Sequence, residues 1–283
     1  MNRKYQIAGH LFEVSGEELC KAIDEMEAFK PFETNKGDVL FSIVKRADFP
    51  SLESIQYEFG YEDVMGKFGR THEGWMLRLA PAEESTLYMW NVEGEQTIQI
   101  YGNFSTRLYR FALWVAFGLM TLPYHTVAIH SSCIVCHNQA FLFLGESGTG
   151  KSTQAELWRV HRNAEVINGD KAGVYLKDGN AFAGGVPFCG TSGICKNKNL
   201  PLKANDGKKI SVISVEPQKI VAAMDEKQCV DMLYKEVKAI HNDTSGLIVK
   251  LNPTDADIKK AVEFCADADT IILGTCSGII FKN

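Results

Sequence analysis

The chain has few prolines, no internal repeat and no low-complexity segment. Its 283 residues include 8 Pro, and no polar run is long enough to serve as an extended linker. Hydrophobic residues make up 45% and aromatic residues 10% of the chain, which excludes a mainly disordered protein. At roughly 150 residues per domain, the length predicts two domains.

Excess positive charge and long apolar runs are also lacking. The 30 Lys and Arg against 35 Asp and Glu give a net charge of −5, so we expect no nucleic-acid partner. The longest apolar run, 111–122, is too short to span a bilayer and predicts a buried helix. Near the N-terminus only 7–9 are apolar before His10, which is too short for a signal peptide. We therefore expect a cytoplasmic protein with no membrane partner.

The eight cysteines show no regular spacing. Without an export signal, they are expected to be reduced thiols that act as small buried hydrophobes. Cys133-Ile134-Val135-Cys136-His137 fits a haem-attachment pattern, but an offset of three in extended chain would put the two thiols on opposite faces. A zinc site is a second alternative, although its second cysteine pair is spaced more widely than usual. That site would use Cys133, Cys136, Cys189 and Cys195.

Hydrophobic periodicity predicts two parts, 1–105 and 106–283. The first part is expected to be a smaller α+β domain that recognises a substrate or serves as a scaffold. Its predicted helix covers 17–29, and its strands cover 39–44, 74–79, 86–90 and 96–101. A helix over 105–122 would join the two parts through a buried interface. The four Trp residues fall in helix or strand patterns and are expected in the core.

The second part is expected to be an α/β domain in which strands alternate with helices. Its first four elements are strands over 127–135 and 140–144, a helix over 152–161, and a strand over 165–167. A hairpin (174–176 with 181–183), a loop (184–205) and a strand (210–215) follow, then helices over 229–240 and 254–266 and a strand over 270–281.

One motif carries clear chemistry. Residues 145–152 fit the G-x-x-x-x-G-K-[ST] pattern of a P-loop, or Walker A motif, between a buried strand and a helix. Glycines allow close approach of phosphate, successive N–H groups bind its oxygens, and the helix dipole adds positive charge. We expect ATP and Mg²⁺ here, with Lys151 on the β- and γ-phosphates and the Ser152 hydroxyl on Mg²⁺. The predicted binding residues are Gly145, Glu146, Ser147, Gly148, Thr149, Gly150, Lys151, Ser152 and Thr153.

The strand before the P-loop strand ends only a few residues earlier. Parallel strands need a crossover of about a dozen residues or more, so this short connection predicts an antiparallel hairpin. The local sheet therefore differs from the parallel plan of GTPases and simple nucleotide kinases.

Three runs together resemble a known family. His130-Ser131-Ser132, the stretch from Phe143 to Thr153, and Val166-Ile167-Asn168-Gly169-Asp170 resemble the catalytic domain of HPr kinase/phosphorylase. Residues 185–190 and 200–203 are similar to diverged relatives of that family, and the resemblance covers roughly 125–250. It implies a mixed-sheet P-loop fold, shared with phosphoenolpyruvate carboxykinase, and a serine kinase acting on a protein or peptide.

The resemblance also implies roles for single residues. His130 matches a histidine in the strand before the P-loop, and Asp170 matches one member of an acidic pair that serves as base and metal contact. A carboxylate at a strand end after a P-loop helix fits either role on chemical grounds as well. The alternatives are a turn-forming aspartate at 170 and a core histidine at 130.

The sequence departs from the family in its cations. No Arg follows Arg162, so the family's arginine contacts to phosphate cannot come from the C-terminal part. The candidate cations there are Lys171, Lys196, Lys198 and Lys203, which are point charges rather than bidentate groups. The phosphorylase reaction is therefore doubtful, and simple solvated lysines are the alternative.

Together these features predict an ATP-dependent kinase that phosphorylates a serine of a protein or peptide. Lys151, Asp170 and His130 are its predicted catalytic residues, and Ser152 and Asp170 its predicted metal contacts. A small-metabolite kinase, a carboxykinase-like enzyme and a non-catalytic ATP-binding regulatory module remain alternatives. The acceptor and the oligomeric state, a homo-oligomer included, stay open.

Overall fold

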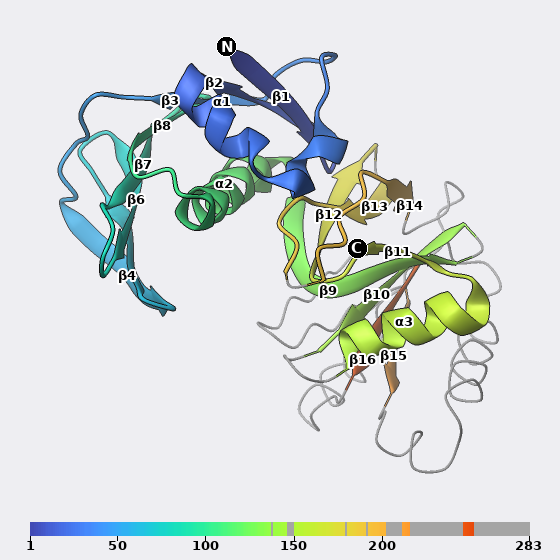
Figure 1. The fold of residues 1–283 in the computed structure, drawn as a ribbon. Coiled ribbons are helices and arrows are strands. Elements are labelled where there is room, and N and C mark those ends of the chain that lie inside the picture. Colours follow the sequence, from blue (N-terminus) through green and yellow to red (C-terminus); the bar gives the residue numbers. More distant parts are fainter. Residues whose placement is uncertain are drawn as a thin grey trace. The chain divides into compact units, whose positions relative to one another are not determined.

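The computed structural model describes residues 1–136, 138–145, 150–178, 180–190, 192–201, 211–215 and 246–251. By its internal contacts the chain divides into two compact units, Met1–Pro123 (unit 1) and Tyr124–Asn283 (unit 2). Each unit contains one 8-stranded sheet in which parallel and antiparallel pairs are mixed (Figure 1). The chain is therefore an α/β protein with mixed sheets.

The sheet of unit 1 has the strand order β1-β2-β3-β8-β7-β6-β5-β4. β3 pairs in parallel with both β2 and β8, and the remaining neighbours are antiparallel. The strands are β1 (Asn2–Ile7), β2 (His10–Ser15), β3 (Phe41–Lys45), β4 (Ser54–Tyr61), β5 (Val64–Arg70), β6 (Gly74–Pro81), β7 (Leu87–Val92) and β8 (Thr97–Gly102).

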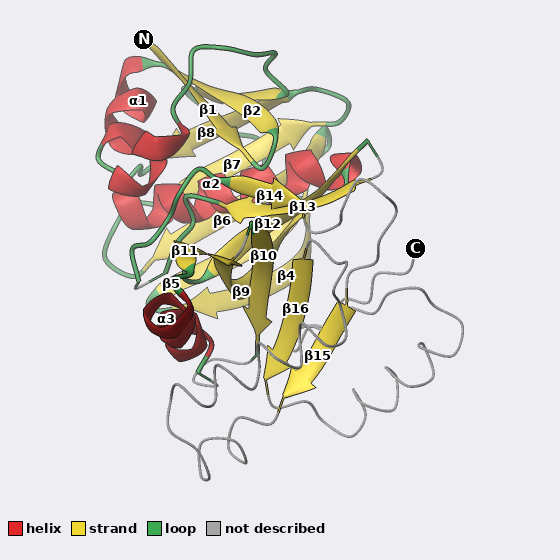
Figure 2. Ribbon diagram, turned by 90° about the vertical axis from the view of Figure 1, so that its right-hand side faces the viewer, coloured by secondary structure: helices red, strands yellow, loops and turns green. Residues whose placement is uncertain are grey.

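Two α-helices and a 3₁₀ helix accompany this sheet (Figure 2). They are α1 (Glu17–Asp24), η1 (Glu27–Phe32) and α2 (Thr106–Thr121). Aromatic rings link them to the strands: Phe12 of β2 stacks on Phe41 of β3 at 5.2 Å and lies 6.5 Å from Phe117 of α2. The predicted helix over 17–29 is thus two shorter helices, and its second half is 3₁₀.

Helix α2 belongs to unit 1, so the predicted boundary after residue 105 moves to the end of this helix. Its buried side chains, including Leu108, Tyr109 and Phe117, lie on the face that contacts α1 and β7. At its first turn, Arg107 forms ion pairs with Asp63 beside β5 and with Glu84. Burial of this apolar face, rather than the polar start of the helix, decides which unit it joins.

The sheet of unit 2 has the order β14-β13-β12-β9-β10-β16-β15, with β11 also paired to β9. The pairs β10–β16 and β15–β16 are parallel, and the pairs made by β9, β12 and β13 are antiparallel. A short 3₁₀ turn, η2 (Leu122–Tyr124), precedes the unit. The elements are β9 (Thr126–Cys136), β10 (Gln139–Leu144), α3 (Lys151–Arg162), β11 (Glu165–Asn168), β12 (Lys171–Lys177), β13 (Asn180–Gly185), β14 (Asn199–Pro201), β15 (Ser211–Val215) and β16 (Gly246–Leu251).

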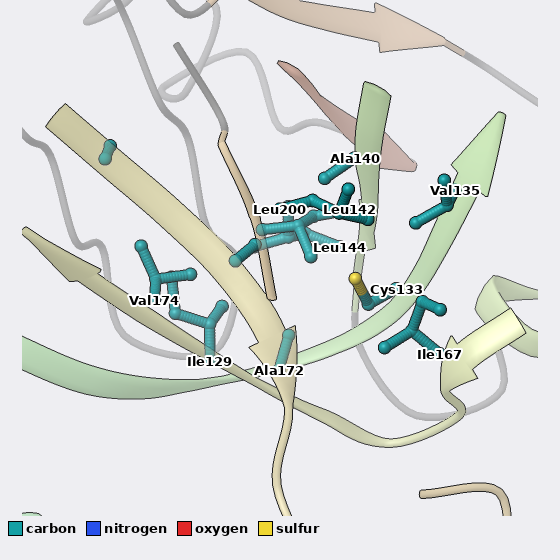
Figure 3. Close-up of a cluster of buried hydrophobic side chains, with 12 residues drawn as sticks. Ile129, Cys133, Val135, Ala140, Leu142, Leu144, Ile167, Ala172, Val174 and Leu200 are labelled. Atoms are coloured by element: carbon teal, nitrogen blue, oxygen red, sulfur yellow. The ribbon is translucent and has the colours of Figure 1, made fainter. Parts of the chain in front are cut away.

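The two faces of this sheet are covered differently. On one face, Trp158 of α3 is fully buried against Phe141 and Phe143 of β10, at ring distances of 5.0 and 5.9 Å. On the other face, Leu142 and Cys133 belong to a buried cluster that includes side chains of β9 to β14 (Figure 3). Side chains alternate along a strand, so each residue's position in the sequence fixes its face.

The predicted hairpin before the P-loop is confirmed, because β9 and β10 are antiparallel and Gln139 pairs with Cys136. The predicted helix after the loop and the hairpin formed by β12 and β13 are also confirmed. The predicted helices over 229–240 and 254–266 and the strand over 270–281 lie outside the described residues. Among described residues no helix is both long and apolar enough to cross a membrane.

Candidate functional site

The predicted P-loop lies between two ordered elements. β10 ends at Leu144 and α3 begins at Lys151, with Gly150 as its N-cap in a left-handed conformation at φ 90°. Glycine adopts this conformation without the steric cost that a Cβ would add. The predicted contacts Glu146, Ser147, Gly148 and Thr149 lie outside the described residues. The strand and helix that the motif requires are therefore in place on both sides of the loop.

Lys151 is turned inward at the start of α3. Its side chain is only 7% exposed, and Nζ donates a hydrogen bond to the Gly145 carbonyl oxygen at 2.8 Å. The ammonium group thus lies at the first residue of the loop. Ser152 and Thr153, which follow it, are exposed, so the Ser152 hydroxyl is accessible to a ligand.

Strand β9 brings the loop and Asp170 near each other. On one side of β9, Ser131 pairs with Leu144, the last residue before the loop. On the other side, the Ser131 N–H donates to the Asp170 carbonyl oxygen at 2.9 Å. Neighbouring strands lie about 4.8 Å apart, so the start of the loop and Asp170 are separated by about 10 Å across β9.

Asp170 lies between two basic side chains. Its Oδ1 is 3.3 Å from His130 Nδ1, and its Oδ2 accepts a hydrogen bond from Lys171 Nζ at 2.7 Å. His130 and Lys171 are directly opposite in the β9–β12 ladder, so both side chains point to one face of the sheet. Ser132 of β9 pairs with Phe143, which packs on α3, and His130 lies two residues before Ser132 on the same strand. Alternate residues of a strand point to the same face, so His130, Lys171 and Asp170 lie on the α3 face of the sheet.

The charges around His130 favour its neutral form. Burial lowers the pKa of His130, the charges of Lys151 and Lys171 lower it further, and the Asp170 carboxylate acts in the opposite direction. A neutral imidazole can donate from Nδ1 toward Asp170 and keep its other nitrogen as an acceptor. His130 therefore has a partner in the structure, as expected if it orients Asp170.

Asn168, a residue with no role assigned from the sequence, holds the turn that carries Asp170. It is fully buried, and its Oδ1 accepts hydrogen bonds from the backbone N–H groups of Asp170 and Lys171 at 2.9 and 2.7 Å. Its Nδ2 donates to the Val186 carbonyl oxygen at 2.9 Å. Asparagine commonly bonds to backbone N–H groups two residues later, so the Asn-Gly-Asp run itself could have indicated this turn.

Residue 169, beside Asp170, has little room for a side chain. A Cβ at residue 169 would lie 2.2 Å from Ser192 Oγ. A side chain as large as a second carboxylate would therefore displace Ser192. Asp170 stands without an acidic neighbour in the described turn.

Two of the candidate phosphate-binding lysines have another partner. Lys196 and Lys198 place their ammonium groups 3.0 and 2.6 Å from the two carboxylate oxygens of Glu165. These contacts fasten the segment after β13 to the start of β11. Lys171, next to Asp170, is the candidate cation that the structure brings into the site, and Lys203 lies outside the described residues.

The expectation of reduced cysteines is wrong at one pair, because Cys189 and Cys195 form a disulfide with their Cα atoms 6.0 Å apart. Spacing in the sequence does not show that the intervening segment folds back on itself. Cys133 and Cys136 are free and buried, so the four-cysteine zinc site is not assembled. Burial raises the pKa of Cys133 to about 12, which makes it an unreactive thiol.

The residues present fit a magnesium nucleotide. Exposed Ser152 and the Asp170 carboxylate supply the oxygen donors that Mg²⁺ prefers, and Mg²⁺ in such sites is held largely by phosphate and water. Lys151 and the N-terminus of α3 supply positive charge for phosphate. In the described part of the chain, no group of three or more His, Cys, Asp or Glu is arranged to hold a metal.

Comparison with known proteins yields a distant structural similarity. No protein-family model and no curated protein sequence matches the chain. Solved structures match in 33 chains, among them the Hpr(Ser) kinase/phosphatase from Coxiella burnetii. That match has a TM-score of 0.22 and 15% sequence identity, and it covers 33% of this chain. The chain spans 62% of the length of that relative.

Proposed function

We propose that this protein is an ATP-dependent kinase that transfers the γ-phosphoryl group of ATP to a serine hydroxyl of a protein or peptide. The observation that carries the proposal is that β9 lies between the predicted phosphate-binding loop and Asp170 and holds both. Leu144, which comes directly before the G-x-x-x-x-G-K-[ST] run, pairs with Ser131 of β9 on one side, and Asp170 is hydrogen-bonded to Ser131 on the other side and contacts His130 of the same strand. A phosphoryl-transfer site needs both a phosphate-binding loop and a group that receives a hydroxyl proton.

The donor half would bind and neutralise the triphosphate. Lys151 is already held at the loop by the Gly145 carbonyl oxygen, and nucleotide binding would redirect its ammonium group to the phosphate oxygens. The Ser152 hydroxyl and Asp170 would hold Mg²⁺, which supplies charge neutralisation when bound. A fixed positive environment stabilises the charge that develops during transfer without reorganising at that moment.

The acceptor half would orient and deprotonate the hydroxyl. The Asp170 carboxylate accepts the hydroxyl proton, and His130 holds this carboxylate through its contact with Oδ1. Lys171 donates to Oδ2 and would place a cation beside the acceptor group. Most of the acceleration would come from positioning and charge neutralisation, because phosphoryl transfer requires little covalent chemistry from the enzyme.

The nature of the acceptor is supported by the sequence resemblance. The runs at 130–132, 143–153 and 166–170 resemble a family whose members phosphorylate serine on a protein. The proposal therefore names a protein or peptide serine rather than a metabolite.

Phosphoryl transfer with labelled donor tests this function. The purified chain is incubated with γ-labelled ATP, Mg²⁺ and two acceptors, HPr and a serine-containing peptide library, and the labelled residue is located by mass spectrometry. Label on serine supports the proposal. ATP binding without transfer to any acceptor indicates the regulatory module, and label found only on small metabolites added in parallel indicates a metabolite kinase.

A further inference from the structure

We propose that Asn168 and Gly190 are positioning residues that hold the Asp170 carboxylate in place from two sides. This inference rests on the proposed function, because it concerns the group that would receive the acceptor proton or contact Mg²⁺. Neither residue carries a charge or a nucleophile, so their role is geometric.

Asn168 holds the backbone of the site. Its buried carboxamide accepts the N–H groups of Asp170 and Lys171 and thereby fixes the turn between β11 and β12. Ser131 N–H and Ser132 Oγ bind the carbonyl oxygens of Asp170 and Gly169 at 2.9 and 3.1 Å. The Asp170 backbone is therefore held by partners on both β9 and β11, and its side chain leaves from a fixed point.

Residues 186–190 and 192–196 lie next to this turn and are bonded to it near both ends. At the start, the Val186 carbonyl oxygen binds the Asn168 carboxamide. At the end, Cys195 pairs with Asn168 by a backbone bridge, and Lys196 N–H donates to the Ile167 carbonyl oxygen at 2.9 Å. The Cys189–Cys195 disulfide links the two stretches. Residues anchored in this way cannot retreat freely from Asp170.

Gly190 is the point at which these residues meet the carboxylate. A Cβ at residue 190 would lie 2.8 Å from Asp170 Cγ and 3.0 Å from its Oδ2. Real Cβ atoms essentially never come as close as 2.8 Å to another heavy atom, so a side chain at 190 must shift either the carboxylate or the bonded residues around Gly190. The carboxylate is held by His130 and Lys171 at its oxygens, and the absence of a side chain at Gly190 leaves the space that this arrangement occupies.

The test is Gly190→Ala in the full chain, combined with Asp170→Ala in a double-mutant cycle. Overpacking of this kind should lower the melting temperature by about 2–8 °C. In the Asp170→Ala background Cγ and Oδ2 are gone and only the contact with the residue 170 Cβ, at 3.1 Å, remains, so the same substitution should cost clearly less. In the chain with Asp170 intact, turnover should fall by about 10–100-fold with the KM for ATP changed by less than about threefold. In the same variant, the ATP affinity measured with Mg²⁺ divided by the ATP affinity measured with EDTA should also fall.

Gly118→Ala is the control, because a Cβ at this helical position meets nothing within 4 Å, so its melting temperature should stay the same or rise. A melting-temperature loss that persists fully in the Asp170→Ala background would overturn the inference, since Gly190 would then act elsewhere. A melting-temperature loss that depends on Asp170, but comes with no change in turnover or in the effect of Mg²⁺ on ATP affinity, would also overturn the inference. If the wild type transfers no phosphoryl group, the proposed function fails, and the positioning role is decided by the melting-temperature cycle together with the Mg²⁺ effect.

Discussion

Lys151 combines burial with a charge that has to be neutralised by a partner. Its ammonium group donates a hydrogen bond to the Gly145 carbonyl oxygen at the first residue of the loop. A triphosphate would offer full negative charge, and charge-assisted hydrogen bonds are roughly twice as strong as neutral ones.

We expect Lys151→Ala to lower ATP affinity by about tenfold or more, because one charge-assisted contact contributes about 1.5–3 kcal/mol. Isothermal titration calorimetry with Mg²⁺ and ATP measures this directly. Lys177→Ala is the matched control, since Lys177 is exposed at the end of β12 and its loss changes the net charge equally. Equal affinity in the Lys151 variant would refute the nucleotide site.

Asp170→Asn should reduce phosphoryl transfer by about 10²–10⁴-fold, because the amide keeps the shape but cannot accept the proton. ATP affinity should change far less than turnover. Single-turnover kinetics with labelled ATP separates the two effects. Asp178→Asn makes the same chemical change at an exposed hairpin position and should leave turnover intact. Turnover of the Asp170 variant within about threefold of wild type would show that this carboxylate is not the base.

At the scale of elements, β9 and α2 have the largest consequences. β9 is the strand that β10, β11 and β12 all pair with, so it places the loop and Asp170 beside each other. α2 completes the core of unit 1, because its apolar face covers α1 and β7. Each element is long and strongly apolar, which is why both are also visible in the sequence.

The placement of α2 predicts the behaviour of two fragments. A fragment of residues 1–123 should fold cooperatively, whereas a fragment of residues 1–105 should not, because it lacks the helix that buries Phe117 against Phe12. Loss of several fully buried apolar side chains costs about 1.5–3 kcal/mol each, which is comparable to the total stability of a small domain. Circular dichroism melting curves and amide proton dispersion in NMR spectra distinguish the two. A cooperative transition in both fragments would place α2 outside the core of unit 1.

At the scale of the whole molecule, two half-buried histidines make stability depend on pH. Burial lowers the pKa of His10 in β2 below its usual value, and the pKa of His130 is lowered in the same direction. In the window between the lowered folded value and the unfolded value of about 6.5, the unfolded chain binds more protons than the folded chain. Stability therefore rises with pH through this window and is lost as the pH falls through it.

We expect the melting temperature to be flat above about pH 7 with respect to these histidines and to decrease as the pH is lowered from about 6.5. His10→Gln should make this decrease shallower, because it removes one group that resists protonation in the folded state. His72→Gln, at an exposed imidazole, serves as the control. The same slope in wild type and in His10→Gln would mean that His10 does not contribute.

Local sequence determined the parts of this protein that depend on near neighbours. The apolar runs and glycine spacing around 140–161 were enough to predict β10, the loop and α3, because strand, turn and helix preferences act over a few residues. The short turn after Cys136 was enough to predict the β9–β10 hairpin, since no crossover fits there. The strand β4 was not predicted, although the alternation of Ile55, Tyr57, Phe59 and Tyr61 could have indicated it in the same way.

Only the tertiary structure decided which distant residues meet. The parallel pairing of β16 with β10, the contact of His130 with Asp170, and the closing of Gly190 on that carboxylate each join residues far apart in the chain. Such contacts depend on strand order and register, which follow from the burial of whole faces rather than from local preference. The sequence therefore determined the chemistry available at the site, and long-range packing decided its geometry.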